Sequence, residues 1–211
     1  PTPPPPPRPT PSTCRRQRQM CIRDRFKDVL NELHQIVFAG VPCETPEFVT
    51  TLLEREYIAY VLACYYQCDH CLNFHERAVS RVREKEQVAD WNWKDDLISV
   101  TLFLHLDGRK LSPMEWERWV MAWRSYAKRI DARHPSLACY LAYAIGIARH
   151  DQSLMDLAFE SISNAHDDND RLKGVIRDID GVVIFMKAAT SKNRSDATIV
   201  QHLKSRGISD I

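Results

Sequence analysis

After the first 25 residues, hydrophobic positions recur at three- and four-residue spacing along most of the chain, which is the pattern of amphipathic helices. No run alternates between apolar and polar positions for long enough to predict a strand. We therefore expect an all-α fold. The predicted helices cover residues 26–37, 46–66, 69–84, 93–106, 152–164, 168–188 and 195–205, and two more start at residues 113 and 135.

Several helix boundaries are marked by capping residues. Thr45 followed by Pro46 is typical of an N-cap with Pro at the first helical position. The sequence from Ser112 to Glu115 is a capping box, and Asp107-Gly108 is a C-cap signal. These signals predict that the second helix starts near residue 46 and that another starts at residue 113.

Other apolar positions predict core packing rather than chemistry. Trp116, Trp119 and Trp123 share one side of a predicted helix, so we expect them in the core rather than around a ligand. Cys64 and Cys139 lie among apolar residues, where a free cysteine behaves as a small hydrophobe. The longest uninterrupted apolar run is residues 57–66, and a membrane span needs about 20 residues. We therefore expect no membrane-spanning segment.

The composition of the 211-residue chain changes sharply after residue 25. Residues 1–25 hold six Arg, one Asp and 8 of the 12 Pro, and they are interpreted as a disordered tail or an artefact of sequencing or assembly. Removing them from the 29 Lys and Arg and 28 Asp and Glu leaves 23 against 27. The remainder is mildly acidic, so no nucleic-acid partner is expected.

The candidate chemistry is concentrated between residues 56 and 75. Cys68 and Cys71 are three residues apart, so at a helix start they lie on one face. Unpaired N–H groups and the partial positive charge at a helix N-terminus favour thiolate over thiol. His75 follows Cys71 by one turn and is placed to act as its base. His70 is predicted to point elsewhere, where it biases the pKa of Cys68 or faces a subunit neighbour.

Glu56 joins this site only if the chain bends. In one straight helix, the twelve residues from Glu56 to Cys68 would span about 18 Å. We predict a break near Tyr66-Gln67, which would also expose the helix start that the thiols need. Glu56 is then the predicted proton relay of the site.

The pattern Glu-x11-Cys-x-His-Cys-x3-His resembles the redox motif of the alkyl hydroperoxidase D (AhpD)-like family, within the carboxymuconolactone decarboxylase superfamily. Glu56, Cys68, His70, Cys71 and His75 each match a position of that motif. The resemblance implies a helical fold, peroxide reduction through a Cys pair without a cofactor, and a homo-oligomer, trimer or hexamer. It also implies that Cys71 attacks the peroxide and that Cys68 resolves the sulfenic acid.

The resemblance covers about 80 residues, so the chain is interpreted in two parts after its tail. Residues 26–110 are the predicted AhpD-like redox domain, and residues 111–211 are a helical C-terminal region in which a degenerate second helical unit could lie. The expected partners are a hydroperoxide substrate and a dithiol or protein reductant. The absence of an export signal and an isolated close Cys pair favour a cytoplasmic protein.

Two alternatives to a thiol peroxidase remain open at this level. In one, Cys68 and Cys71 are half of a zinc site with His75 or His70, to which His105 or Cys43 could be recruited. In the other, the protein is a redox sensor without turnover whose C-terminal region contacts a partner. The acidic run at residues 166–170 is expected to cap a helix rather than to bind a cation. The isolated histidines are expected at the surface or at helix ends: His34, His105, His134, His150, His166 and His202.

Overall fold

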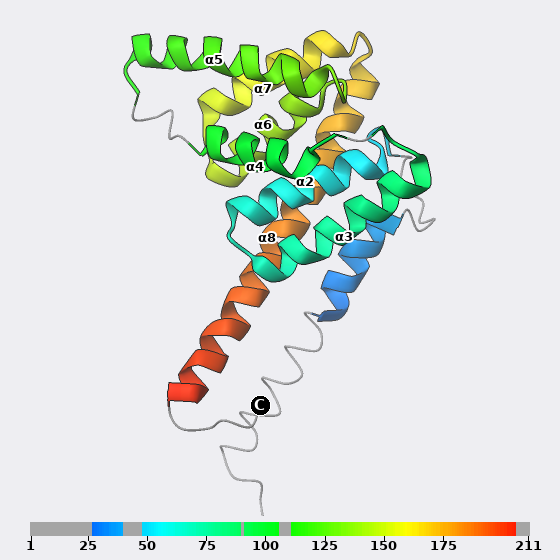
Figure 1. Cartoon of the computed structure of the whole chain (residues 1–211), viewed down its shortest axis with the longest axis vertical. Helices are drawn as coiled ribbons and strands as arrows, with labels where there is room; N and C mark the ends of the chain where they lie inside the picture. The colour runs from blue at the N-terminus through cyan, green and yellow to red at the C-terminus, as the bar shows by residue number, and fades with distance from the viewer. Residues whose placement is uncertain (1–26, 40–47, 90, 106–110, 206–211) are drawn as a thin grey trace, which may run out of the picture.

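The computed structural model describes residues 27–39, 48–89, 91–105 and 111–205, with side chains to residue 191. Over these residues the fold contains helices and no strand, which confirms the all-α prediction. Residues 27–34 are helical and continue into a π-helical turn, η1 (Gln35–Ala39). The helices that follow are α2 (Leu52–Tyr65), α3 (Asp69–Glu86), α4 (Trp93–Leu104), α5 (Pro113–Asp131), α6 (Leu137–Arg149), α7 (Gln152–Ala165) and α8 (Asn169–Ser205) (Figure 1).

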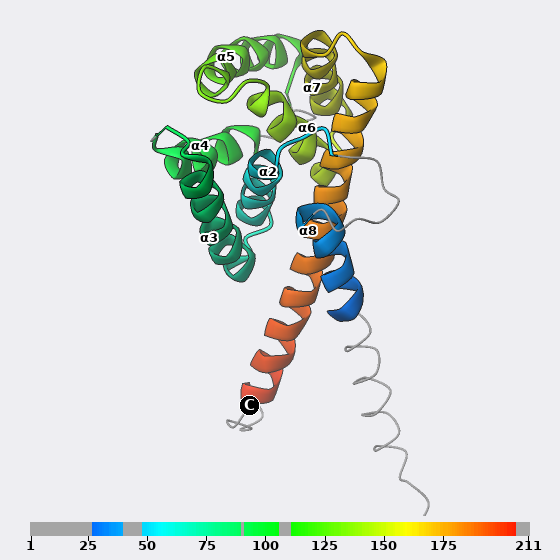
Figure 2. The ribbon, with the colours of Figure 1, turned by 90° about the vertical axis from the view of Figure 1, so that its right-hand side faces the viewer.

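Helix α2 lies at the centre of the fold. Figure 2 shows it between α3 and α4 on one side and α8 on the other, and it also contacts α6. Every side chain from residue 53 to residue 63 is buried. A helix covered on all sides has no polar face, which explains the uninterrupted apolar run seen in the sequence.

The chain bends sharply between α2 and α3, as the sequence predicts. Tyr66 and Gln67 form the turn, and Gln67 has a φ of 54°, in the left-handed region. The N–H of Cys68 donates to the carbonyl of Ala63 at 3.0 Å, which closes the end of α2. Helix α3 starts one residue later at Asp69, so α2 and α3 return side by side.

The start of α2 differs from the prediction. The helix begins at Leu52 rather than near residue 46, because Thr51 and Glu54 form the capping box that starts it. Phe48 to Thr50 are not helical. The predicted cap at Thr45-Pro46 lies outside the described residues.

Buried Asp178 of α8 holds this non-helical segment in place. Its Oδ2 accepts hydrogen bonds from the N–H groups of Val49 and Thr50, at 2.7 and 2.9 Å. Gly174, one turn earlier on α8, allows the close approach: a Cβ there would lie 2.3 Å from a methyl carbon of Val49. The segment before α2 is thus fixed by a helix more than a hundred residues away in sequence.

The two helices predicted at 168–188 and 195–205 are one. Helix α8 runs without a break from Asn169 to Ser205. Residues 188–195 contain neither Gly nor Pro, so nothing in them forces a helix to end. Its C-terminal part extends beyond the other helices (Figures 1 and 2).

Residues before and after position 110 share one hydrophobic core. The buried residues of α2, α3, α4, α6, α7 and α8 form a continuous cluster. The tryptophan stripe of α5 only partly joins it: Trp123 is buried, whereas Trp116 and Trp119 are half-buried and stack on each other with ring centroids 4.9 Å apart. The expectation of core packing therefore holds for Trp123 and, in part, for Trp119, which packs against the core, and it is wrong for Trp116.

Two other helix-end signals predicted from the sequence are confirmed, and a third lies outside the described residues. Ser112 and Glu115 form the predicted capping box at the start of α5. Asp168 accepts a hydrogen bond from the N–H of Asp170 at 2.9 Å at the start of α8, so this acidic run caps a helix as predicted. The Asp107-Gly108 pair lies outside the described residues. No helix in the described part of the chain is long and apolar enough to cross a membrane.

Candidate thiol site

The two cysteines of the motif lie at the start of α3. Cys68 is its N-cap residue, and Cys71 lies three residues further on in the first turn. The Sγ of Cys68 accepts a hydrogen bond from the N–H of Cys71 at 3.4 Å. The two residues form a disulfide, with their Cα atoms 5.3 Å apart. Both sulfurs therefore lie where a helix N-terminus stabilises negative charge.

His75 and Glu56 form a buried pair one turn along α3. The Nδ1 of His75 lies 2.8 Å from the Oε2 of Glu56, and their side chains are 2% and 5% exposed. An ionised carboxylate only accepts hydrogen bonds, so Nδ1 is the donor and Nε2 is left free to take up a proton. The bend at Gln67 brings Glu56 of α2 to His75 of α3, across 19 positions of sequence.

A cavity of about 330 Å³ opens beside this pair. Cys71 and His75 line it, together with His34, Phe74 and Phe185. Of the two cysteines of the motif, Cys71 lines this cavity and Cys68 is not found in its described lining. A small ligand in the cavity would therefore meet Cys71 and the imidazole of His75 together.

His70 lies at the edge of this cavity. Its side chain is exposed and borders the space that Cys71 lines, as one of the polar residues around it. It was predicted to point elsewhere on the helix than Cys71 and His75; its side chain is exposed, yet it borders the same cavity as those two residues. A position at the edge suits contact with a neighbouring subunit or a bound ligand.

His34 was expected at the surface or at a helix end, and the structure buries it more than a surface residue. It is half-buried in the cavity, and its ring centroid lies 5.2 to 5.7 Å from those of Phe38, Phe74 and Phe185. Burial lowers its pKa, the charge of Glu56 opposes this shift, and His75 adds to it. No sequence pattern indicates this position, because it depends on how the first helix packs against α3 and α8.

The other two described cysteines are poor nucleophiles. Burial raises the pKa of Cys64 to about 11 and that of Cys139 to about 12. Cys139 is buried, as expected, and its thiol donates to the carbonyl of Ser136 at 2.9 Å. Cys64 is half-buried rather than fully enclosed. Cys64 lies near the C-terminal end of α2, whereas Cys139 lies in the first turn of α6, where burial outweighs the effect of the helix N-terminus on its pKa.

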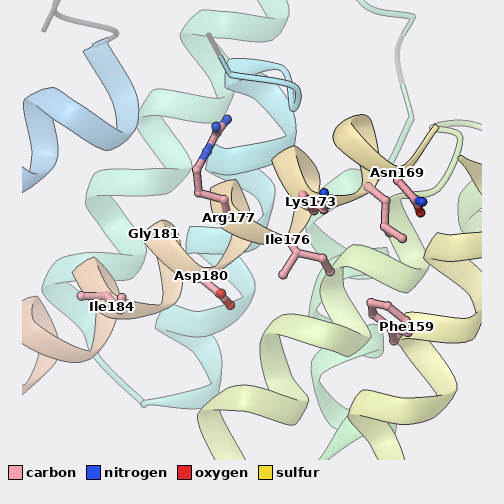
Figure 3. A pocket seen from close by; sticks show the side chains of 9 residues that line it. Phe159, Asn169, Lys173, Ile176, Arg177, Asp180, Gly181 and Ile184 are labelled. Atoms are coloured by element: carbon pink, nitrogen blue, oxygen red, sulfur yellow. The ribbon is translucent and has the colours of Figure 1, made fainter. Parts of the chain in front are cut away.

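A larger hollow of about 690 Å³ lies elsewhere, between α7 and α8. Figure 3 shows Phe159 of α7 and Ile176 of α8 beside it, with Asp180 and Arg177 further along α8. Its lining holds no cysteine or histidine. Cys71 and His75 both line the smaller cavity, so the candidate site is assigned there.

For the alternative zinc site, no set of metal ligands is found among the described residues. Among the residues that the structure describes, no three His, Cys, Asp or Glu side chains are grouped so that they could hold a metal ion. His105 lies against Tyr65, with ring centroids 5.9 Å apart. Cys43 lies outside the described residues.

Comparison with protein-family models gives no match for this chain. Comparisons with curated proteins and with solved structures give no match either.

Proposed function

We propose that this protein is a cofactor-free thiol peroxidase that reduces hydroperoxides through the Cys68–Cys71 pair. One observation supports it above the others: Cys71 and His75 line the same cavity, and Glu56 is hydrogen-bonded to the far side of that imidazole. A nucleophile, a base and a group that orients the base are the parts that thiol catalysis requires. The resemblance of the motif to the AhpD-like family supports the same reaction.

The first step activates the sulfur. Glu56 holds the Nδ1–H of His75, so the free Nε2 takes the proton of the Cys71 thiol. The unpaired N–H groups at the start of α3 stabilise the thiolate that forms. The carboxylate of Glu56 stabilises the imidazolium, so the separated charges are each compensated within a buried site.

Peroxide reduction then follows from attack by that thiolate. The sulfur of Cys71 bonds to one peroxide oxygen as the O–O bond breaks. The electron pair of the broken O–O bond stays on the other oxygen. That oxygen takes the proton held by His75 and departs as an alcohol, which leaves a sulfenic acid on Cys71.

The second cysteine completes the cycle. The sulfur of Cys68 attacks the sulfenic acid, the disulfide forms, and the hydroxyl leaves with the Cys68 proton as water. An external dithiol or protein reductant returns the pair to thiols by thiol–disulfide exchange. The Cys68–Cys71 disulfide is therefore the oxidised resting form of the proposed cycle.

Two substitutions test the proposal. Cys71→Ser should abolish consumption of cumene hydroperoxide in the presence of a dithiol. Cys68→Ser should stop turnover after one oxidation and leave a sulfenic acid on Cys71 that dimedone traps, as read by mass spectrometry. Full multiple turnover by the Cys68 variant would refute its resolving role. A wild-type protein that oxidises once and is not recycled by a dithiol would instead be a redox sensor.

The proposal includes assembly into a homo-oligomer, trimer or hexamer. Besides the resemblance, exposed apolar side chains on α4 and α5 support it: Leu102 is 71% exposed and Met121 is 72% exposed. Light scattering coupled to size-exclusion chromatography tests this. A monomeric mass at micromolar concentration would contradict it.

A further inference from the structure

Among the described residues, His34 is the one imidazole that lines the cavity of the thiol site from outside α3. It ends the first helical segment, over residues 27–34, and borders the cavity of Cys71 and His75. It also borders an adjoining groove that Glu56 lines. His34 therefore lies next to the nucleophile, the base and the carboxylate that orients the base.

The surroundings of His34 fix its ring and leave its nitrogens available. Phe38, Phe74 and Phe185 pack around the ring, with centroid distances of 5.2, 5.6 and 5.7 Å. Within the described part of the chain, no hydrogen bond to either of its nitrogens is found. A half-buried imidazole that is held by aromatic rings and lines a cavity can donate an N–H to a molecule bound there.

We propose that His34 is a further catalytic residue, whose N–H donates a hydrogen bond to the leaving oxygen of a hydroperoxide in contact with Cys71. This inference rests on the proposed function. As the S–O bond forms and the O–O bond breaks, negative charge develops on the outer oxygen. His34 stabilises that charge and keeps its own proton, while His75 delivers the proton that makes the alcohol.

The two imidazoles are expected to have different roles because their environments differ. His75 is paired with a carboxylate and can carry the positive charge of a transferred proton. His34 has aromatic neighbours, and burial keeps its pKa below the usual value, so it stays neutral at pH 7. A neutral imidazole is a hydrogen-bond donor but a very weak acid, which suits stabilisation rather than proton transfer.

A substitution series separates this role from simple packing. His34→Phe keeps an aromatic ring among Phe38, Phe74 and Phe185 but removes both nitrogens, whereas His34→Gln retains an N–H donor. Two rates are measured in a Cys68→Ser background: oxidation of Cys71 by cumene hydroperoxide, and alkylation of Cys71 by iodoacetamide. Alkylation needs the thiolate and access to it, but it breaks no O–O bond.

The expected result is selective. His34→Phe should slow oxidation about 10- to 100-fold, somewhat less than the loss of a fully buried oxyanion donor, and leave alkylation within about twofold. His34→Gln should recover most of the oxidation rate. His105→Phe is the matched control, because His105 is exposed and contacts Tyr65 outside the cavity, and it should change neither rate.

Three outcomes would overturn the inference. Oxidation by the His34→Phe variant at the wild-type rate would show that no donor is needed. Parallel loss of oxidation and alkylation would show that the ring acts through the thiol or the shape of the cavity. A His34→Gln variant as slow as His34→Phe would show that the N–H is not the active feature. Failure of the unsubstituted His34 protein to react with the hydroperoxide, with normal alkylation, would refute the proposed function itself and this inference with it.

Discussion

Replacing Glu56 with Gln tests the buried pair on which the proposed chemistry depends. The substitution keeps the shape of the side chain and an oxygen that can accept from the Nδ1 of His75, which lies 2.8 Å from the present carboxylate. It removes only the negative charge. We expect peroxide turnover to fall while the fold persists, because the neutral imidazole remains hydrogen-bonded and the imidazolium loses its counter-charge.

The expected size of the effect follows from the burial of the pair. A charge-assisted hydrogen bond contributes about 1.5–3 kcal/mol and a neutral one about 0.5–1.5 kcal/mol, so the loss is at least about 1–1.5 kcal/mol, near tenfold in rate. Two charges centred about 4 Å apart interact by about 4 kcal/mol at an effective dielectric constant of 20, which sets an upper limit near 1000-fold. With both side chains at most 5% exposed, solvent screens this interaction little.

The assay is steady-state consumption of cumene hydroperoxide with a dithiol as reductant, alongside thermal unfolding. Glu76→Gln is the matched control: Glu76 is the residue next to His75 on α3, and its carboxylate pairs with Lys94 at the surface. That exposed pair should contribute less than about 1 kcal/mol to stability and nothing to turnover. Glu56→Gln should therefore slow turnover about 10- to 1000-fold, whereas Glu76→Gln should leave turnover unchanged.

Turnover by Glu56→Gln within twofold of wild type would refute the reasoning. The buried pair would then be a structural contact, and His75 would need no counter-charge during the reaction. A drop in unfolding free energy well above about 1.5 kcal/mol would also contradict it, because the glutamine would not have replaced the hydrogen bond.

Three further predictions concern groups outside the pair. At pH 8, iodoacetamide should label Cys64 and Cys139 at least about 100-fold more slowly than a free peptide thiol, as measured by peptide mass spectrometry, because burial raises their pKa values to about 11 and 12. Asp178→Ala should lower the unfolding free energy by about 2–5 kcal/mol, because two backbone N–H groups before α2 lose their acceptor; unchanged thermal unfolding would contradict this. Burial raises the pKa of Asp180, so the protonated carboxyl stabilises the folded state at low pH. This stabilisation is lost as pH rises through the folded-state pKa. Asp180→Asn should therefore raise stability at pH 7, by at most about 0.5 kcal/mol for this half-exposed side chain, and should not do so near pH 3.

The sequence predicted the site better than it predicted the helix boundaries. The distance from Glu56 to the cysteines required a bend, and the bend lies at Gln67 as expected. The site depends on local spacing along two consecutive helices, which periodicity and helix geometry describe well. The roles of its residues remain predictions that the kinetic experiments test.

The misplaced start of α2 shows where local signals compete. Thr45 followed by Pro46 is a good local start signal, but the capping box that starts the helix in the structure, Thr51 with Glu54, lies six residues later. What holds the segment before Leu52 out of the helix is Asp178, more than a hundred residues away in the sequence. No local pattern contains that contact.

His34 was missed for the same physical reason. A lone histidine at the end of an amphipathic helix is usually a surface residue, and its spacing to Cys71 carries no information, since they lie on separate helices. Its ring enters the cavity because the first helix packs near Phe74 of α3 and Phe185 of α8. Residues brought together by tertiary packing need the structure to be found.

The turn at Gln67 supports the proposed chemistry in two ways. By ending α2 it lets a new helix begin at Asp69, and that N-terminus supplies the N–H groups and partial charge that favour a thiolate. By reversing the chain it lays α3 along α2, which brings the carboxylate of Glu56 to His75. A straight helix would have separated Glu56 from Cys68 by about 18 Å and left the cysteines in mid-helix, where every N–H is already bonded. The left-handed conformation at a residue other than glycine costs about 1 kcal/mol, which is small beside the two features that it makes possible.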